Sequence, residues 1–183
     1  MEITISGKPG SGKTTVGKLV AKKLKLKFYS EGEFQRKLAR QLSISIIELN
    51  KISERSKNYD KILDQRQIDL GVTQDNFLLD SRLGWYFIPD AVKIFLDVKL
   101  DEAAKRIFHD KKRKAEKNID IKITKKNIKQ RIKLEKEKYK QKYNLNPYLK
   151  KHYDLYLDTT KLLPERVAEK IIKFVKKKIK QKR

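Results

Sequence analysis

Short apolar runs alternate with amphipathic segments along this chain. Five runs have the length and composition of buried strands, and they cover residues 3–5, 28–30, 76–80, 91–97 and 154–158. Helical spacing links the apolar positions after the first run, which are Val16, Leu19, Val20 and Leu24. Strands that alternate with helices predict an α/β fold, in which a parallel sheet of five strands lies between two layers of helices.

The chain between the second and third strands predicts a helical excursion from this alternation. Residues 45–48 read Ser-Ile-Ile-Glu, which is the pattern of a capping box. A further helix is expected from about Tyr59 to Leu70, with Gly71 as its C′ residue. We therefore expect a helical arm over about residues 31–71 of a single domain.

A second excursion follows the fourth strand. Asp101 is expected to cap a helix that breaks into a polar run at residues 110–114. Few apolar residues occur before Thr124, where a long helix is expected to begin, so residues 110–127 predict a small lid. Pro164 is expected to begin the closing helix, and the basic tail at residues 176–183 is expected to fray or to touch an acidic partner.

A phosphate-binding loop joins the first strand to the first helix. Residues 7–14 fit the pattern G-x-x-x-x-G-K-[ST] and stand between a strand and a helix, as this loop requires. Its backbone N–H groups would surround a phosphate chain, Lys13 would reach the β- and γ-phosphates, and the Thr14 hydroxyl would ligate Mg²⁺. The predicted ligands are ATP and Mg²⁺, and the loop residues assigned to them are Gly7, Lys8, Pro9, Gly10, Ser11, Gly12, Lys13, Thr14 and Thr15.

Three more polar residues lie near the predicted carboxyl ends of strands, the edge where α/β sheets bind ligands. Asp80 ends the third strand as a Walker-B acid does, so we assign it to Mg²⁺ together with Thr14. Arg82 follows two residues later, where its planar fork suits a phosphate dianion. Arg36 lies one turn beyond Gly32 and either holds a second phosphate or is a surface arginine.

Two helices carry polar side chains that have an ordinary interpretation beside the functional one. Asp64, Arg66 and Gln67 either read a base edge or form surface pairs. Arg131, Glu135 and Lys138 follow helical spacing and form a polar stripe, which on spacing alone is typical of solvated ion pairs. His109 and His152 lie in polar surroundings and are expected at the surface.

Charge and composition limit the classes of partner. Lysine and arginine number 47 against 23 acidic residues, which leaves a formal net charge of +24. Because this excess is spread over several segments, we interpret it as lysine on solvated helix faces and expect no specific nucleic-acid partner. The chain has no cysteine, no apolar run of membrane-spanning length and no signal-peptide pattern, so we expect a cytoplasmic monomer that acts on small nucleotides.

Several motifs of one known family occur together in this chain. The strand and loop I-x-I-S-G-x-P-G-S-G is matched by residues 3–12, and S-x-G-E-x-x-R-x-L-A-R by residues 30–40. L-D-x-R-Q is matched by Leu63, Asp64, Arg66 and Gln67. The final element, an acidic residue with G-R-L and then P-x-A-x-x-K-I-x-L-D, is matched within residues 80–97. With these motifs the chain resembles the archaeal-type cytidylate kinases, a group of the nucleoside monophosphate kinases.

The resemblance implies transfer of the ATP γ-phosphoryl group to CMP, and to dCMP, by a P-loop kinase with an acceptor-binding arm and a lid. It implies that Arg36 and Arg82 hold the acceptor phosphate and that Glu135 lies near the acceptor nucleoside. Arg106, Arg131 and Lys138 would belong to the donor side and the lid. The candidate catalytic residues are Lys13, Arg82 and Arg131. The candidate acceptor-site residues are Ser30, Gly32, Arg36, Asp64, Arg66, Gln67, Arg82, Glu135 and Lys138.

The sequence departs from the family pattern at four places. Ser81 stands for the usual glycine beside Arg82, and Gly84-Trp85 falls one position early. Lys138 stands where arginine is typical, and Asp110 occupies a lid position where arginine is expected, although residues 111–113 supply basic groups nearby. Adenylate and uridylate kinases, shikimate-type kinases and RNA-binding P-loop NTPases remain as alternatives, since all of them use the same loop.

Overall fold

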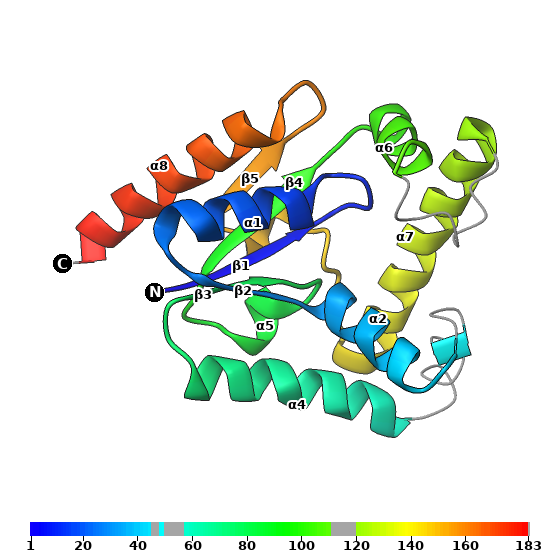
Figure 1. Cartoon of the computed structure of the whole chain (residues 1–183), viewed down its shortest axis with the longest axis horizontal. Helices are drawn as coiled ribbons and strands as arrows, with labels where there is room; N and C mark the ends of the chain where they lie inside the picture. Colours follow the sequence, from blue (N-terminus) through cyan, green and yellow to red (C-terminus); the bar gives the residue numbers. More distant parts are fainter. Residues whose placement is uncertain (45–47, 50–56, 111–119, 183) are drawn as a thin grey trace.

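The computed structural model describes residues 1–44, 48–49, 57–110 and 120–182 (Figure 1). Residues 45–47 of the predicted capping box lie outside these ranges, as does half of the predicted lid, residues 111–119. All five predicted strands fall within the described residues, so the sheet can be compared with its prediction.

The sheet has five parallel strands, as predicted. The strands are β1 (Glu2–Gly7), β2 (Lys27–Ser30), β3 (Phe77–Asp80), β4 (Val92–Asp97) and β5 (Leu155–Asp158). They lie in the order β2-β3-β1-β4-β5, and every neighbouring pair is parallel. Because β1 is central, the loop that follows it emerges at the middle of the sheet's carboxyl edge.

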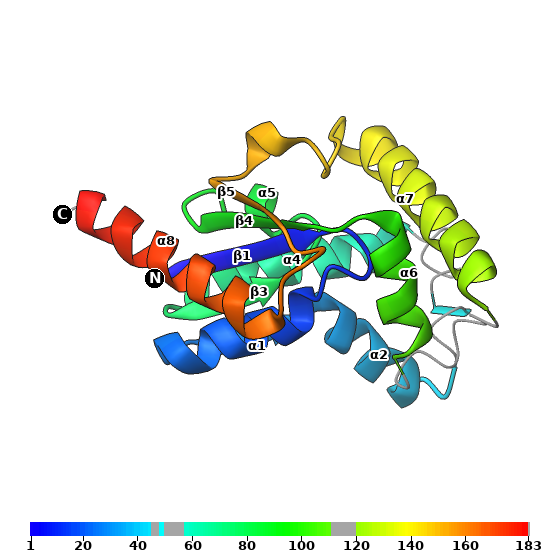
Figure 2. The same cartoon turned by 90° about the horizontal axis from the view of Figure 1, so that it is seen from above.

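Helices cover both faces of this sheet, which confirms the three-layer α/β/α prediction (Figure 1). The described helices are α1 (Lys13–Leu24), α2 (Glu31–Gln41), α4 (Lys57–Thr73), α5 (Gly84–Phe87), α6 (Leu100–Phe108), α7 (Ile121–Tyr143) and α8 (Pro164–Lys182). One face lies under α1 and α8, the other under α4 and α5, while α2, α6 and α7 stand beyond the carboxyl ends of the strands (Figures 1 and 2).

The side chains of β3 point alternately to the two faces of the sheet, so this strand contributes to two hydrophobic cores. Leu78 points to the α1 and α8 side, where it packs with Val20 and Ile171. Its neighbours Phe77 and Leu79 point to the opposite side and pack with residues of α4 and the segment after α5. All of these side chains are buried, and each contributes roughly 1.5–3 kcal/mol relative to an exposed position. The strand must therefore be apolar at all three positions from Phe77 to Leu79, as its sequence is.

The predicted end of α4 was wrong. Gly71 lies inside the helix, which continues to Thr73. A Cβ atom at Gly71 would lie 3.1 Å from a side-chain carbon of Ile88, so the glycine lets α4 approach the segment after α5 closely. A glycine that serves packing and one that ends a helix look alike in sequence.

Two predicted helix starts also differ. Asp101 lies within the first turn of α6, and Lys99 is the N-cap residue. The long helix α7 begins at Ile121 rather than at Thr124, because the Asp120 side chain caps it by accepting a hydrogen bond from the Ile123 N–H over 2.7 Å. At the other end of the chain the basic tail continues α8 as helix to Lys182.

Candidate active site

The loop between β1 and α1 has the geometry that its sequence pattern predicts. Gly10 has a φ of 79°, and a Cβ atom there would lie 2.8 Å from backbone atoms of Ala103 on α6. The close approach therefore requires glycine. Gly12, with a φ of 83°, is the N-cap residue of α1, so the amino end of that helix opens onto the loop. This arrangement suits an anion, because helix N–H groups and the helix dipole point at the same place.

Lys13 lies inside this loop. Its Nζ donates to the backbone carbonyl oxygens of Gly7 and Lys8 over 3.1 and 3.4 Å. Burial and the neighbouring charge of Arg82 hold the pKa of Lys13 well below its ordinary value. An anionic phosphate in the loop would restore the charged form, so the lysine is built to meet phosphate oxygens.

Thr14 and Asp80 face each other across the sheet edge. The Thr14 hydroxyl donates to Oδ2 of Asp80 over 2.6 Å. Asp80 ends β3 beside Ser30 of β2, and it is 7 % exposed. A hydroxyl and a carboxylate at this separation form part of the hard-oxygen set that Mg²⁺ prefers, with phosphate and water completing it. The two residues therefore fit the metal role assigned from the sequence.

Arg82 is held from two sides. Its Nε and Nη2 donate to the Glu135 carboxylate over 2.8 and 3.2 Å. Its Nη1 donates to the Gly7 carbonyl, the oxygen that also accepts from Lys13. The structure thus brings two predicted catalytic cations, from distant parts of the sequence, onto one backbone carbonyl.

Glu135 connects these groups to α7. Oε1 also accepts from Arg131 Nε over 3.0 Å, and Oε2 also accepts from the Tyr148 hydroxyl. Burial alone would raise the pKa of Glu135, but the charges of Arg82 and Arg131 outweigh it and lower the pKa to about 2. The carboxylate is therefore ionised at any physiological pH and accepts four hydrogen bonds from protein groups.

The acceptor arm begins where β2 ends. Ser30 is the N-cap residue of α2, and its hydroxyl accepts from the Glu33 N–H over 3.3 Å. One turn later the Arg36 side chain is exposed, and its guanidinium lies next to Gly32, 3.4 Å from where a Cβ atom would be. Arg36 therefore reaches back toward the carboxyl edge of the sheet, as the acceptor-phosphate role requires.

Glu31 was not singled out from the sequence, but it is a central residue of this arm. It forms an ion pair with Arg66 of α4, whose guanidinium also stacks on the Phe34 ring at 4.2 Å. Only 7 % of Glu31 is exposed, and burial raises its pKa to about 7 in spite of Arg66. The two residues are 35 positions apart, so spacing along the chain carries no signal for the pair.

Side chains of α4 contact α7 and the segment after β3. The Tyr143 hydroxyl donates to Oδ2 of Asp64 over 2.5 Å, and burial raises the pKa of that carboxyl. Gln67 accepts from the Ser81 hydroxyl over 2.5 Å. Ser81, which departs from the family's glycine, thereby fixes one of the residues that the resemblance assigns to the acceptor.

Lys138 joins α7 to the arm. Its Nζ lies 2.9 Å from a carboxylate oxygen of Asp60, a buried residue of α4 that also forms an ion pair with Lys142. Lys138 was assigned both to the acceptor site and to the cluster of the donor side and the lid, and this contact brings it to the acceptor arm. The ion pair thereby joins α4 to α7.

Arg106 contacts the segment after β5, next to the phosphate loop. Its guanidinium donates to the carbonyl oxygens of Thr159 and Thr160 over 2.8 and 3.1 Å, and the Thr159 hydroxyl contacts the Ser11 carbonyl at 3.2 Å. Arg106 thus braces the segment after β5 against the loop. Thr15, one residue beyond Thr14 on α1, is exposed.

The two histidines differ from each other. His109 is exposed, as predicted. His152 was expected at the surface but is half-buried, with its ring stacked on Trp85 at 4.2 Å. Burial lowers its pKa, which is consistent with a packing role. Neither histidine is among the residues that contact the phosphate loop.

Comparison with known proteins agrees with this geometry. The family model described as "Cytidylate kinase-like family" matches residues 2–161. The chain belongs to the cytidylate kinase-like family. A cytidylate kinase of Methanobrevibacter smithii is 32 % identical over 96 % of this chain and 99 % of its own length. A cytidylate kinase of Sulfolobus acidocaldarius is 35 % identical over 97 % of this chain and 96 % of its own length.

Solved structures share the fold of this cytidylate kinase-like protein at low identity. A shikimate kinase from Bacteroides thetaiotaomicron has a TM-score of 0.68 at 17 % identity and covers 96 % of this chain and 98 % of its own. A shikimate kinase from Acinetobacter baumannii, in complex with shikimate, has a TM-score of 0.63 at 14 % identity and covers 97 % of this chain and 93 % of its own. The fold is that of a P-loop kinase, and with the family it makes the protein an ATP-dependent kinase.

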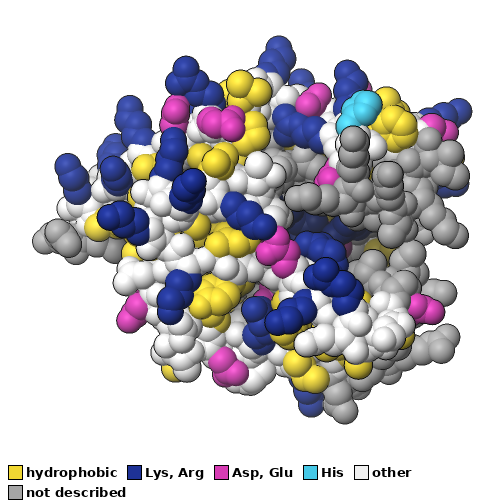
Figure 3. All heavy atoms as spheres, in the orientation of Figure 1, with side chains coloured by type: hydrophobic (Ala, Val, Ile, Leu, Met, Phe, Trp, Pro, Cys, Tyr) yellow, Lys and Arg dark blue, Asp and Glu magenta, His cyan; other side chains and the backbone are white. Residues whose placement is uncertain are grey.

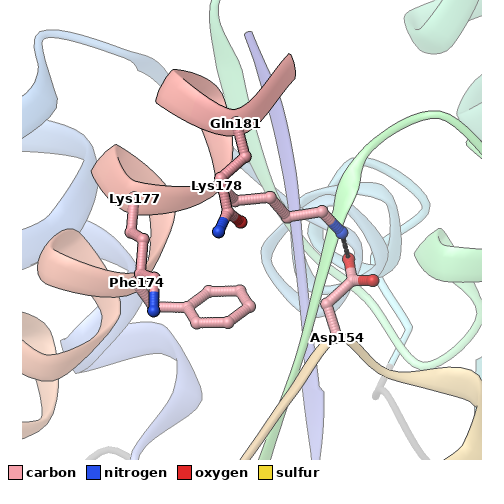
Figure 4. Close-up of a pocket in the computed structure, with 5 residues that line it drawn as sticks. All are labelled: Asp154, Phe174, Lys177, Lys178 and Gln181. Carbon is pink, nitrogen blue, oxygen red and sulfur yellow. Dashed lines mark ion pairs between the residues drawn. The ribbon is translucent and has the colours of Figure 1, made fainter.

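A pocket of about 320 Å³ lies away from the phosphate loop of this kinase (Figure 4). It is lined by Asp154, Phe174, Lys177, Lys178 and Gln181, and Lys178 forms an ion pair of 2.5 Å with Asp154. Asp154 directly precedes β5, so the pocket is at the amino end of that strand, whereas Thr14 and Asp80 lie at the carboxyl edge of the sheet. It is therefore separate from the candidate active site.

Positive charge covers much of the surface. Figure 3 shows lysine and arginine side chains spread over the visible face, with acidic side chains among them. This distribution is consistent with lysine on solvated faces, and the expectation that no nucleic acid binds specifically stays a prediction. None of the helices in the described part of the chain is long and apolar enough to cross a bilayer.

Proposed function

We propose that this kinase transfers the γ-phosphoryl group of ATP to CMP, giving ADP and CDP, and that dCMP is a second acceptor. One observation carries the proposal: Lys13, Arg82 and Arg131 converge beside the Thr14–Asp80 pair, opposite an arm that carries Arg36. Two sets of phosphate-binding groups facing each other suit a reaction between a nucleoside triphosphate and a phosphorylated acceptor.

The donor side is formed by the loop after β1. Its backbone N–H groups and Lys13 hold the β- and γ-phosphates of ATP, while Arg106 supports the segment that borders the loop. Thr14 and Asp80 would hold Mg²⁺, which when bound neutralises charge on the phosphate oxygens. Gly7, Lys8, Pro9, Gly10, Ser11, Gly12 and Thr15 complete the proposed ATP site.

The acceptor side is formed by α2 and α4. Arg36 and Arg82 hold the phosphate of the acceptor, with Ser30 and Gly32 shaping the turn from which Arg36 extends. Asp64, Arg66 and Gln67 border the nucleoside, and an acidic group there can accept from the cytosine exocyclic amine, which uracil lacks. Glu135 and Lys138, both on α7, complete the proposed acceptor site.

The reaction needs cations and positioning more than it needs a general base. The acceptor phosphate is already nucleophilic, and the charge that develops on the transferring oxygens is stabilised by fixed positive groups. Lys13 and Arg82 are held in place by the Gly7 carbonyl before the reaction begins. This preorganisation saves the cost of arranging the charges during transfer.

The test is a comparison of acceptors under one set of conditions. We expect stoichiometric conversion of ATP and CMP to ADP and CDP, with kcat/KM falling in the order CMP, dCMP, UMP, AMP. A highest kcat/KM for AMP or UMP would contradict the proposal. Phosphate release that is faster with RNA and independent of CMP would instead indicate an RNA-dependent NTPase. Gel filtration tests the expected monomer.

A further inference from the structure

The Glu135 carboxylate is fully occupied by protein groups in this structure. A carboxylate offers about four lone-pair sites, and each oxygen of Glu135 accepts two hydrogen bonds. Arg82 and Arg131 donate to Oε1, while Arg82 and Tyr148 donate to Oε2. Glu135 therefore acts on the acceptor side through the groups that it holds.

Three of these four bonds come from predicted catalytic cations, and the fourth comes from Tyr148. Tyr148 is absent from every motif of the resemblance and from the proposed ATP and acceptor sites. Its hydroxyl donates to the ionised Glu135 carboxylate, and Arg82, which donates to the same carboxylate, also contacts the Gly7 carbonyl beside Lys13. A continuous chain of hydrogen bonds thus runs from Tyr148 to the phosphate loop.

Tyr148 itself is held firmly. Its backbone N–H donates to Oδ1 of Asn146 over 3.0 Å, and the Tyr153 hydroxyl donates to the preceding carbonyl, that of Pro147, over 2.5 Å. Its ring meets Phe95 of β4 edge to face, at 6.1 Å between centroids. Phe95 is buried at the centre of the sheet. The tyrosine therefore links Glu135 of α7 to a rigid part of the fold.

We propose that Tyr148 is a positioning residue for phosphoryl transfer: its hydroxyl fixes the Glu135 carboxylate, which in turn fixes Arg82 and Arg131 beside the transferring phosphate. Without this bond, Glu135 can follow α7 away from β4, and both arginines move with it. Displacement of catalytic groups by about 1 Å can lower a rate by a factor of about 100. The proposal rests on the proposed kinase function but concerns residues that this function does not assign.

The phenol is suited to this role. Burial raises the pKa of Tyr148 above its ordinary value, so the hydroxyl keeps its proton and donates at all physiological pH. Burial lowers the intrinsic preference of Glu135 for the ionised form, but Arg82 and Arg131 outweigh it and lower the pKa of Glu135 to about 2. Donor and acceptor therefore keep their roles throughout the pH range in which the kinase would work.

The test compares Tyr148→Phe with Tyr156→Phe. Tyr156 also packs on Phe95, and its hydroxyl donates to Asp97 over 2.8 Å. We expect Tyr148→Phe to lower kcat about 10-fold, with KM for ATP and CMP within about two-fold of wild type. We expect Tyr156→Phe to keep kcat within about two-fold, with a similar change in melting temperature. Equal kcat for the two variants, or a rise in KM for CMP without a loss of kcat, would overturn the proposal.

A second measurement separates this role from a general effect on stability. In a double-mutant cycle with Glu135→Ala, which removes the carboxylate that accepts this bond, the effect of Tyr148→Phe on kcat should disappear. Full additivity of the two effects would overturn the inference. If the wild-type protein converts ATP without using CMP, the proposed function fails, and the same cycle measured on ATP turnover still tests whether Tyr148 acts through Glu135.

Discussion

The Thr14 hydroxyl and the Asp80 carboxylate meet at 2.6 Å although they lie 66 residues apart. Parallel pairing of β1 with β3 produces this contact, because Asp80 is in register with Ile5 just before the phosphate loop. The loop then returns the chain so that the first turn of α1 carries Thr14 back toward the strand end. The pair is therefore a consequence of sheet register and loop length together.

The first prediction concerns this pair. Asp80→Asn keeps the shape of the side chain but removes the charge that would hold Mg²⁺. We expect the Mg²⁺ concentration for half-maximal activity to rise about 10-fold or more, since hard cations bind carboxylates far better than amides. A titration of initial rate against Mg²⁺ measures it. Asp69→Asn on the exposed side of α4 is the control. Unchanged Mg²⁺ dependence would remove Asp80 from the proposed metal site.

Lys13→Ala should abolish most of the activity. One preorganised charge on transition-state oxygens typically contributes a factor of at least ~100 in kcat, so we expect a loss of that size. Steady-state kinetics with ATP and CMP measure the loss, and Lys18→Ala serves as control, because Lys18 is an exposed lysine of the same helix paired with Glu33. A loss below about three-fold would mean that Lys13 does not meet the transferring phosphate.

Arg36→Ala should weaken the binding of CMP and leave the binding of ATP unchanged. Because the Arg36 guanidinium lies beside Gly32 on the acceptor arm, we expect KM for CMP to rise about 10-fold or more while KM for ATP stays within about two-fold. Arg40→Ala, one turn further along α2, should leave both unchanged. Equal weakening of both substrates would contradict the assignment of Arg36 to the acceptor phosphate.

Asp64→Asn should weaken the preference for CMP over UMP. The change replaces an acceptor oxygen by an amide that donates, so a cytosine amine loses a partner that uracil never had. We expect the ratio of kcat/KM values for CMP and UMP to fall about 10-fold or more. Asp69→Asn is the matched control on the same helix. If CMP remains the best acceptor and the ratio is unchanged, only the contact of Asp64 with the base is wrong.

Glu31→Gln should change how stability depends on pH. The pKa of Glu31 is raised from 4.5 to about 7 in the folded protein, so the folded state binds a proton more tightly than the unfolded state. The contribution of Glu31 to the free energy of unfolding is fully present below pH 4.5 and is lost as pH rises through about 7. This contribution is about 3 kcal/mol at most. Melting temperatures from pH 5 to pH 8.5 should fall more steeply for wild type than for Glu31→Gln. A parallel fall in both proteins would contradict the prediction. Glu33→Gln is the exposed control.

The sequence predicted those parts of the molecule that depend on local pattern. The strands, most helices and the phosphate loop follow from apolar spacing and a contiguous motif, and the structure confirms them. Gly71 was misread because its role depends on Ile88, which lies 17 positions further along the chain. The N-cap residues of α6 and α7, Lys99 and Asp120, lie a few residues before the predicted helix starts, because sequence pattern locates helix ends only to within a few residues.

The contacts that assemble the site depend on tertiary structure. Glu31 with Arg66, Asp60 with Lys138, and Tyr148 with Glu135 each join side chains of different elements. On its own helix, Glu135 looked like one member of an i,i+4 ion pair with Arg131, a pair that is present. Its more consequential partners, Arg82 and Tyr148, come from the segment after β3 and from the segment before β5, and no periodicity relates them to it.

The arm that bears Arg36 and Asp64 leaves the sheet after Ser30 and returns at Phe77. Because β2 and β3 are parallel neighbours, with Lys27 paired to Phe77 and Ser30 to Asp80, the arm crosses from the carboxyl end of one strand to the amino end of the next outside the sheet. A connection of this kind can change its length and side chains at little entropic cost, while the sheet and the phosphate loop keep their geometry. Acceptor preference and phosphoryl-transfer chemistry can therefore diverge separately during evolution, as one inherited frame takes on new acceptors.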